Sequence, residues 1–434
     1  MKVSGWGHYP VVNARLSRPC SQKDILSEIQ ACETSENIAR GLGRSYGDSS
    51  LAQNIIETTQ MDQVLDFNEA TGILTCSAGV SLATILDSFV NKGWFLPVSP
   101  GTKFVTVGGA IASDVHGKNH HQNGTFSDHV ISISIATVSE GIIFCDRTSH
   151  SQLFRATCGG MGLTGIIVEA QIKLMPLQST YIDQQTIKTG NLDETLDLFE
   201  SHSGKHYSIA WIDCLSVGKQ LGRSVLMLGE HSENGSFHDY ERSSFRIPTF
   251  LPSCTLNKYT VRTFNSFYYH RSQTTHGNKS VHYEDFFYPL DRISNWNFIY
   301  GRDGFVQYQF VVPEASGLNT LKSILKKVSD SGLGSFLSVL KKFGPSNENY
   351  ISFPFDGYTL ALDFKIHTRL FDLLDHIDKI VLSSGGRIYL SKDSRMSERT
   401  FKESYPEWEK FMEVRKAYKA DKVFNSAQSI RLGL

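Results

Sequence analysis

Apolar residues in the first 178 positions follow two different periodicities. In residues 21–32 and 81–93 they recur every three or four positions, as on one face of an amphipathic helix. Ser21 stands three residues before Asp24, an imperfect capping box at the start of the first helix, and Gly93 ends the second. Other apolar runs predict strands at residues 54–60, 72–80, 129–138 and 164–177.

The pattern changes after Pro176, where the predicted strands become longer and more aromatic. They lie at residues 207–216, 224–230, 304–313 and 358–366. Two amphipathic helices are interspersed, one from Leu318 to Val328 and one from Leu370 to Val381. Strands followed by a helix, twice, predict a largely antiparallel sheet with helices on one face.

The length of the chain predicts two domains. Its 434 residues exceed what one compact core usually holds, and we expect an α+β fold. The first domain covers residues 1–178 and the second residues 179–386. Residues 387–434 are too short to fold alone, and we expect them to return to the first domain.

The overall charge gives no reason to expect nucleic acid as a partner, because the net charge is only −1. One segment differs from the rest. Between Arg242 and His282 there are six Lys or Arg residues and no Asp or Glu, interleaved with Phe and Tyr. This composition is typical of a surface that contacts anionic lipid or a phosphorylated ligand. A mobile surface loop explains it equally well.

The cysteines and the N-terminus indicate in which cellular compartment the protein resides. Seven cysteines are scattered without a CxxC pair, which favours reduced thiols over disulfides or a zinc site. The first residues lack an apolar signal core, and no segment has membrane-spanning length. We therefore expect a cytoplasmic protein whose membrane contact is at most peripheral, at the inner face.

Two glycine-rich stretches suggest a phosphate-bearing ligand. In residues 39–50, Gly41, Gly43 and Gly47 permit close backbone approach, and Arg44 adds a donor. The stretch fits neither a Walker nor a Rossmann fingerprint. A second stretch, residues 100–121, repeats these features, and its small residues at 107–113 would let the backbone lie flat against a planar ring. Together they suggest one large dinucleotide lying across the first domain.

Three histidines in the second stretch raise the question of a metal site. His120 and His121 are adjacent, so in regular structure they point apart, and no cysteine or carboxylate pair completes a set with His116. We predict no metal.

Several motifs, taken together, resemble one flavoenzyme family. In chain order they are GWG (5–7), ARGLGRSYGD (39–48), PGTKFVTVGGAIASDVHGKNHH (100–121), ATCGGMGLTGII (156–167), GFVQYQFVVP (304–313), FGPSNENYISFPF (343–355) and GGRIYLSKDSR (385–395). They resemble the decaprenylphosphoryl-β-D-ribose 2-oxidase family, within the vanillyl-alcohol-oxidase and p-cresol-methylhydroxylase class of FAD proteins. The resemblance implies a PCMH-type FAD domain followed by a substrate domain.

The resemblance also implies which residues hold the cofactor. They are Ala39, Arg40, Gly41, Leu42, Gly43, Arg44, Ser45, Tyr46, Gly47, Asp48, Ser49, Gly101, Thr106, Val107, Gly108, Gly109, Ser113, Asp114, Val115, His116, Ile167 and Tyr389. Members of this class that attach FAD covalently place a histidine in the first glycine loop. Arg44 is the nearest equivalent here, so we expect non-covalent FAD.

The implied reaction is oxidation of a secondary hydroxyl, with hydride transfer to flavin N5. His116 matches a histidine beside the substrate hydroxyl, and Tyr389 matches a residue that reaches the flavin. Lys392 matches a lysine whose charge stabilises the reduced ring. The residues that match the sugar-phosphate pocket are Tyr46, Lys118, Gln309 and Lys341. Gln307 and Gln309 alternate with Tyr308, so both point to one face of the strand, and a polar face in an apolar run is typical of a binding floor. We expect Gln307 and Lys392 to contact the substrate as well. Ala361 stands where mycobacterial members carry a cysteine that the chemistry does not need.

The implied substrate is a pentose linked through phosphate to a polyprenyl lipid. Its oxidation would be the first half of an epimerisation that a separate short-chain reductase completes. An alditol or aldonolactone oxidase acting on free sugars is an alternative, which the basic segment at 242–282 disfavours. A flavin-holding binding protein without turnover is another, which the presence of both His116 and Lys392 disfavours.

Overall fold

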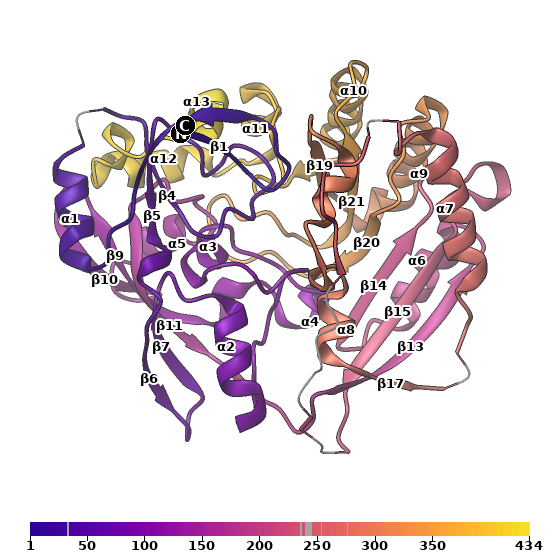
Figure 1. The fold of residues 1–434 in the computed structure, drawn as a ribbon, viewed down its shortest axis with the longest axis horizontal. Helices are drawn as coiled ribbons and strands as arrows, with labels where there is room; N and C mark the ends of the chain where they lie inside the picture. The colour runs from indigo at the N-terminus through magenta and orange to yellow at the C-terminus, as the bar shows by residue number, and fades with distance from the viewer. Residues whose placement is uncertain (33, 235–236, 239–244, 253, 276) are drawn as a thin grey trace.

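The computed structural model describes residues 1–434 apart from 33, 235–236, 239–244, 253 and 276. It has two lobes, each with its own sheet system (Figure 1). In the first lobe an antiparallel sheet has the order β10-β9-β11-β7-β6, and a parallel sheet has the order β3-β5-β4. Their bounds are β3 Arg15–Ser17, β4 Asn37–Arg40, β5 Asn54–Glu57, β6 Val64–Asn68, β7 Ile73–Ser77, β9 Val130–Thr137, β10 Gly141–Asp146 and β11 Ile166–Lys173.

The helices of the first lobe begin where the sequence predicts. Helix α1 (Gln22–Gln30) is capped by the Ser21 side chain, which accepts a hydrogen bond from the backbone N–H of Asp24. Helix α2 (Leu82–Phe89) buries the predicted apolar face, and the chain then turns at Gly93 with φ of 84°. The remaining helices of this lobe are α3 Val107–Ala112, α4 His120–Asn123 and α5 Ser151–Thr157.

The second lobe is built on one large sheet with the order β17-β13-β15-β14-β20-β21-β19-β22. Every neighbouring pair in it is antiparallel. The bounds are β13 Tyr181–Thr189, β14 Tyr207–Ile212, β15 Ser224–His231, β17 Lys279–His282, β19 Phe305–Pro313, β20 Ser338–Phe343, β21 Gly357–Lys365 and β22 Arg387–Ile388. The predicted α+β class with a large antiparallel sheet is confirmed.

Helices that also contact one another form a layer against this sheet. They are α6 Leu192–Ser201, α9 Glu314–Ser331 and α10 Leu370–Ser383. Helices α9 and α10 bury the predicted apolar positions, among them Leu321, Ile324 and Val328 in α9 and Leu374 and Val381 in α10. Sheet residues that this layer leaves uncovered, among them Gln309, Val339 and Ala361, line a cavity together with residues of the first lobe.

The segment 242–282 is not one continuous loop. Residues Lys258–Arg271 form helix α7, so a loop over the whole range is wrong. The Asn257 side chain caps this helix. Asn265, a residue of the helix itself, is buried and donates a hydrogen bond to the Asp213 carboxylate at 2.9 Å. A polar residue at a buried position obscures the helical apolar repeat in the sequence. Arg242 and the rest of 239–244, 253 and 276 lie outside the described residues, and mobility there stays a prediction.

The C-terminal residues form helices that contact the first lobe. The helices are α11 Glu398–Ser404, α12 Trp408–Ala417 and α13 Ala427–Leu432. Phe424 forms an isolated β-bridge with Asn37, the first residue of β4, and Arg431 of α13 forms an ion pair with Asp48 at 2.8 Å. The sequence predicts that residues 387–434 return to the first domain. Arg387 and Ile388 do not, because they form β22 at the edge of the large sheet.

Short elements complete the described structure. They are β1 Lys2–Ser4, β2 Val11–Asn13, β8 Trp94–Phe95, β12 Met175–Pro176, β16 Phe245–Arg246, β18 Ile293–Ser294 and α8 Tyr283–Phe287. Within the described residues, no helix is both long and apolar enough to cross a bilayer.

Candidate active site

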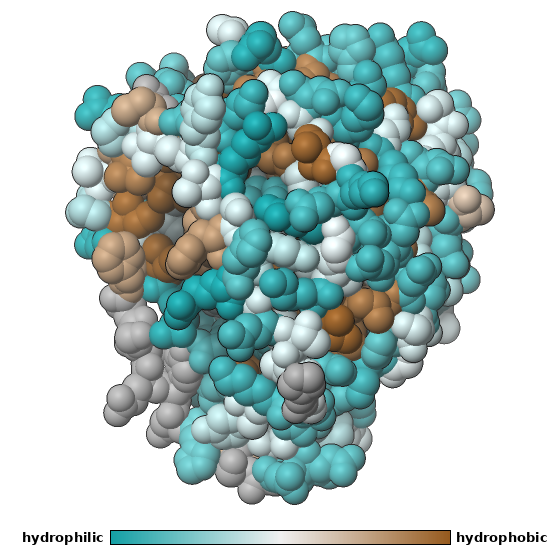
Figure 2. Space-filling model, turned by 90° about the vertical axis from the view of Figure 1, so that its right-hand side faces the viewer, coloured by the Kyte–Doolittle hydropathy of each residue, from teal (hydrophilic) through white to brown (hydrophobic). Residues whose placement is uncertain are grey.

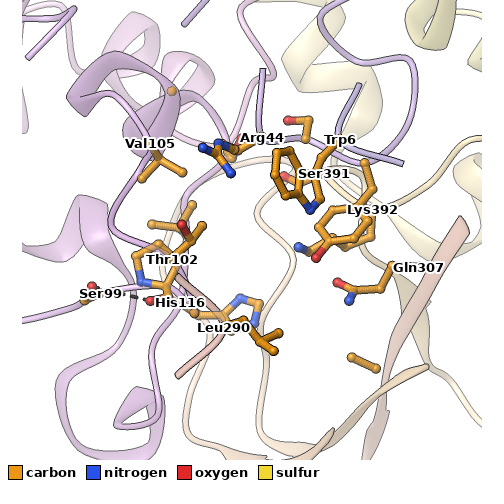
Figure 3. A pocket seen from close by; sticks show the side chains of 18 of the residues that line it. Trp6, Arg44, Ser99, Thr102, Val105, His116, Leu290, Gln307, Ser391 and Lys392 are labelled. Carbon is orange, nitrogen blue, oxygen red and sulfur yellow. Dashed lines mark hydrogen bonds between the residues drawn. The ribbon is translucent and has the colours of Figure 1, made fainter. Parts of the chain in front are cut away.

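A cavity of about 740 Å³ lies between the glycine-rich stretches of the first lobe and the uncovered face of the large sheet. Arg44, His116, Gln307 and Lys392 converge on it from different parts of the chain (Figure 3). The predicted residues that line it are Ala39, Arg40, Gly41, Leu42, Gly43, Arg44, Ser45, Tyr46, Ser49, Gly101, Thr106, Gly108, Gly109, Ser113, Val115, His116, Lys118, Ile167, Gln307, Gln309, Lys341, Tyr389 and Lys392.

The glycine loop, residues 39–50, leaves β4 and forms one wall of the cavity. A Cβ on Gly41 would stand 2.2 Å from Thr106 Oγ1, and one on Gly43 would stand 2.1 Å from Arg40 Nη2. Gly43 also has φ of 64°, which side chains rarely adopt. The loop therefore requires glycine, and its backbone is free to approach a ligand closely. Together with the Arg40 and Ser45 side chains, this fits the pyrophosphate of FAD.

Two predicted cofactor residues of this loop, Gly47 and Asp48, face away from the cavity and fix the loop from behind. Gly47 packs so closely that a Cβ would stand 1.8 Å from the backbone oxygen of Asp393. The buried Asp48 carboxylate accepts two hydrogen bonds from Arg431, at 2.8 and 3.2 Å. Arg431 also pairs with the Asp393 carboxylate at 2.9 Å. The C-terminal helix α13 thus holds the glycine loop in place.

Helix α3 forms a second wall, with its small residues toward the cavity. The Thr106 side chain caps it by accepting from the N–H of Gly109 at 3.1 Å, and a Cβ on Gly108 would be only 3.0 Å from Ala78 Cβ. Val107 turns into the core instead and is fully buried. At the far end, the Tyr389 hydroxyl donates to the Ser113 carbonyl at 3.2 Å, which brings the C-terminal segment onto this wall.

Asp114 is buried beneath the cavity and does not line it. It adopts φ of 40°, and its carboxylate accepts hydrogen bonds from Asn347, Asn349 and Ser352, at 2.8, 3.0 and 2.6 Å. These partners belong to the motif at 343–355. The polar residues of that motif therefore hold Asp114 beneath the cavity and do not themselves point at a ligand.

Arg44 lies against aromatic rings. Its guanidinium carbon is 4.1 Å from the centre of the Trp6 ring and 5.4 Å from that of Phe104. Burial lowers the pKa of this guanidinium, although Asp291 opposes the shift. The GWG motif therefore serves as a platform for Arg44. A guanidinium at this place cannot form the histidyl bond of covalent flavoproteins.

A hydrogen-bond network fixes the protonation of His116. The Thr359 hydroxyl donates to the Phe310 carbonyl at 2.8 Å, so it accepts from Gln309 Nε2 at 3.1 Å. The same Gln309 nitrogen is 3.1 Å from His116 Nε2. Since this amide nitrogen only donates, His116 Nε2 accepts, and the proton of the neutral ring lies on Nδ1.

His116 stays neutral because of its surroundings. Burial lowers its pKa well below the usual range, and Lys341, His120 and Lys392 lower it further. Phe343 and Tyr389 surround the ring, with centres 4.7 and 5.1 Å away. Among the described residues, His116 Nδ1 has no hydrogen-bond partner although it is buried. An unpartnered Nδ1–H beside a cavity is suited to donate to a ligand oxygen.

Three lysines, Lys118, Lys341 and Lys392, line the same cavity; we call them the lysine cluster. Burial lowers the pKa of Lys118 to about 7, of Lys341 to about 8 and of Lys392 to about 7. Lys341 further lowers the other two pKa values by repulsion. Lys118 donates to the Phe286 carbonyl, and Lys392 Nζ lies 3.8 Å from the centre of the Tyr46 ring. Mutual repulsion among buried cations is relieved by a bound anion.

Asp363 is a residue of this site that the sequence did not indicate. It stands on β21 opposite Gln307 of β19, and its buried carboxylate accepts from Gln307 Nε2 at 2.5 Å and from the Tyr300 hydroxyl at 3.1 Å. Burial raises its pKa to about 7, whereas Gln307, Lys392 and Tyr300 lower it. Its charge in turn raises the pKa of Lys392. No motif surrounds Asp363, and only strand pairing brings it here.

The other two histidines of the 100–121 stretch have separate partners. His120 Nδ1 accepts from the N–H of Gly344 at 3.1 Å, and His121 Nε2 lies 2.8 Å from the Lys205 carbonyl. The described part of the chain contains no group of three or more His, Cys, Asp or Glu that could hold a metal.

Comparison with known proteins identifies the class. Residues 14–145 match the FAD binding domain family. Over its whole length the chain is 36% identical to decaprenylphosphoryl-beta-D-ribose oxidase of Mycolicibacterium smegmatis, and it covers 97% of that protein. L-gulono-1,4-lactone dehydrogenase of Mycobacterium tuberculosis is 20% identical over 96% of each chain. Bovine L-gulonolactone oxidase is 22% identical over 49% of this chain and 48% of its own.

The cavity and these matches define an FAD-dependent oxidoreductase that acts on CH–OH groups. Within that class, the chain belongs to the decaprenylphosphoryl-β-D-ribose oxidase family. The predicted cofactor and the predicted resemblance are both confirmed.

Proposed function

We propose that the enzyme oxidises a secondary hydroxyl, at C2, of a pentose carried on a polyprenyl phosphate. The observation that carries this proposal is the lysine cluster. Burying three cations around one cavity is costly, and Asp363 offsets the charge of Lys392. A phosphodiester supplies a counter-charge for Lys118 and Lys341, whose pKa values are lowered by burial. A free, uncharged sugar or lactone supplies none.

In this proposal Lys118 and Lys341 bind the phosphate. They come from opposite walls, since Lys118 follows α3 and Lys341 lies on β20, where its Nζ is 3.5 Å from the Gly117 carbonyl. Two cations approaching from different sides fix both the position and the orientation of a phosphate group. They direct the sugar toward His116.

His116 and Lys392 act at the sugar. The neutral Nδ1–H of His116 donates to a sugar oxygen and orients the carbon that loses hydride. Bound FAD supplies the two-electron acceptor. Lys392, protonated below a pKa of about 7, places a positive charge where negative charge develops during the reaction.

The glycine loop, α3 and Tyr389 hold the cofactor in this proposal, and they hold it without a covalent bond. The support is Arg44, which is the nearest equivalent in the sequence to the linking histidine of covalent members of the class and whose guanidinium lies against the Trp6 ring. Acid precipitation should release all of the yellow colour into the supernatant. A fluorescent flavin band that remains with the protein on a denaturing gel would contradict the assignment.

The substrate class is tested by anaerobic reduction of the bound flavin. Farnesylphosphoryl-β-D-ribose, farnesylphosphoryl-β-D-arabinose, free ribose and L-gulono-1,4-lactone are compared at equal concentration. We expect bleaching by a prenylphosphoryl pentose and at most slow bleaching by the last two. Faster reduction by the lactone or by free ribose would favour the oxidase of soluble sugars. No reduction by any of the four would contradict the proposed function.

Two partners belong to the proposal. The keto sugar formed would require a separate short-chain reductase to complete an epimerisation. The exposed basic side chains of Arg246, Lys258, Arg262 and Arg271 would contact an anionic membrane peripherally. Arg262→Glu with Arg271→Glu should weaken binding to phosphatidylglycerol vesicles, whereas Arg399→Glu, an exposed change on α11, should not. Equal binding by all three proteins would exclude membrane contact through this segment.

A further inference from the structure

We propose that the polyprenyl chain of the substrate lies in an apolar groove that runs from the lysine cluster across the large sheet and under helix α7. The inference rests on the proposed function and assigns a place to the part of the substrate that takes no part in the chemistry. We call this surface the tail groove; Ala361, Val339, Trp211, Met227, Phe264 and Tyr268 define it.

The floor of the tail groove follows from the register of adjacent strands. Gln309, the partner of His116, is paired across the sheet with Ala361, Ala361 with Val339, and Val339 with Trp211. On the next strand, Met227 pairs with Ile209, which lies on the same face as Trp211. Directly paired residues share one face of a sheet. The row therefore leads away from the catalytic end over four strand spacings, roughly 19 Å.

Burial sets four residues on the cavity face apart from their chain neighbours. Met227, Ile209 and Ala361 are each half-buried, although both chain neighbours of each are buried. Val339 is likewise half-buried between buried neighbours. All line the cavity, and none carries a charge or a polar group. These four strands thus keep a strip of apolar side chains open to the cavity, between chain neighbours that pack into the core.

Helix α7 covers the strip with one aromatic face. Tyr268 lies against Trp211, with ring centres 4.6 Å apart, and Phe264 lies one turn earlier on the same face. Both rings line the cavity, and Phe264 is nevertheless 44% exposed. Phe267, by contrast, points away from the cavity and is 64% exposed. The side of the molecule that carries α7 shows apolar patches among hydrophilic surface (Figure 2).

An uncharged hydrocarbon chain is the occupant that these features fit. The groove is continuous with the lysine cluster, so a ligand whose phosphate is bound by Lys118 and Lys341 directs its ester substituent into it. Water in a strip without polar partners is readily displaced by hydrocarbon, which favours binding in proportion to the apolar area removed from water. The polar groups of a sugar or a peptide would find no partner against Ile209, Met227, Val339 and Ala361.

The test compares two substrates and three variants of the FAD-loaded enzyme, without vesicles. The substrates are farnesylphosphoryl-β-D-ribose and methylphosphoryl-β-D-ribose, which share the sugar and the phosphate and differ only in the chain. Phe264→Asp and Met227→Gln change the groove at half-exposed positions that tolerate polar side chains. Phe267→Asp makes the same kind of change on the outer face of α7 and serves as the control. Flavin content and melting temperature verify that each variant is folded.

We expect Phe264→Asp and Met227→Gln to raise KM for the farnesyl ester by about tenfold and to leave KM for the methyl ester within about twofold. Phe267→Asp should change neither. Equal effects on both esters, no effect on either, or equal effects of Phe264→Asp and Phe267→Asp would each overturn the groove. If the wild-type enzyme turned over both esters with the same KM, the tail groove would be contradicted while the proposed function would stand. Turnover of neither ester would overturn both.

Discussion

The glycine loop and the sheet face opposite it form two walls of the same cavity. The first wall is made of main chain and the second of side chains. Residues 39–50 shape their wall with main chain, because any side chain at Gly41, Gly43 or Gly47 would collide with a neighbour. The sheet shapes its wall with side chains, which range from the cation of Lys341 to the methyl group of Ala361. A wall of main chain is suited to one constant ligand, and a wall of side chains can be altered one residue at a time.

The two walls also differ in how they respond to charge and pH. The glycine loop is held by the Asp48–Arg431 ion pair, with the guanidinium pKa raised by neighbouring carboxylates. The lysine cluster holds groups whose pKa values lie at about 7 and 8, so its charge changes within the physiological range. We therefore expect mutations of the first wall to affect cofactor retention and mutations of the second to affect turnover.

The largest effect is expected from the glycine loop. Gly47→Ala places a Cβ against the backbone oxygen of Asp393, where no flexible atom can yield, and should displace the loop and give colourless protein. Gly204→Ala is the matched control, since a Cβ there meets nothing within 4 Å. The ratio of flavin to protein absorbance after purification measures the result. A Gly47→Ala protein with full flavin content would contradict the description of this wall.

The next largest effect is expected from Lys392. Lys392→Ala should slow substrate-driven flavin reduction by about a hundredfold, because it removes a preorganised charge near the developing negative charge. The protein should still purify yellow, since the glycine loop is unchanged. Stopped-flow reduction under anaerobic conditions measures the rate. A variant that reduces its flavin at the wild-type rate, or one that purifies colourless, would show that this role of Lys392 is misassigned.

The difference between the walls also decides what could be predicted from the sequence. The glycine loop is local, and its spacing of Gly41, Gly43 and Gly47 already indicated a phosphate cradle. The lysine cluster combines residues 118, 341 and 392, which only the fold brings together, so the sequence indicated them through family resemblance alone. Asp363 was missed because a lone aspartate within a strand carries no signal. Helix α7 was missed because buried Asn265 interrupts its apolar repeat.

Asp363 provides a smaller effect that depends on pH. Lys392 is charged below its pKa of about 7, so the rate of flavin reduction should fall as pH rises through that value. Asp363→Asn removes the charge that raises this pKa, and the fall should move to lower pH. At pH 7 the variant should be slower by up to about tenfold. At low pH, where the Asp363 carboxyl is itself protonated, the two rates should converge. If the rate of flavin reduction fell at the same pH in wild-type enzyme and in Asp363→Asn, Asp363 would have no influence on the pKa of Lys392.

The most direct test of the proposed function is a measurement of whether the lysine cluster recognises phosphate. Flavin reduction by methylphosphoryl-β-D-ribose is compared with reduction by methyl β-D-ribofuranoside, in wild-type enzyme and in Lys341→Met, which retains a long unbranched side chain. Wild-type enzyme should prefer the phosphorylated sugar, and Lys341→Met should lose about thirtyfold or more in kcat/KM for the phosphorylated sugar alone. Equal loss for both sugars, or no preference in the wild-type enzyme, would contradict phosphate recognition by the lysine cluster.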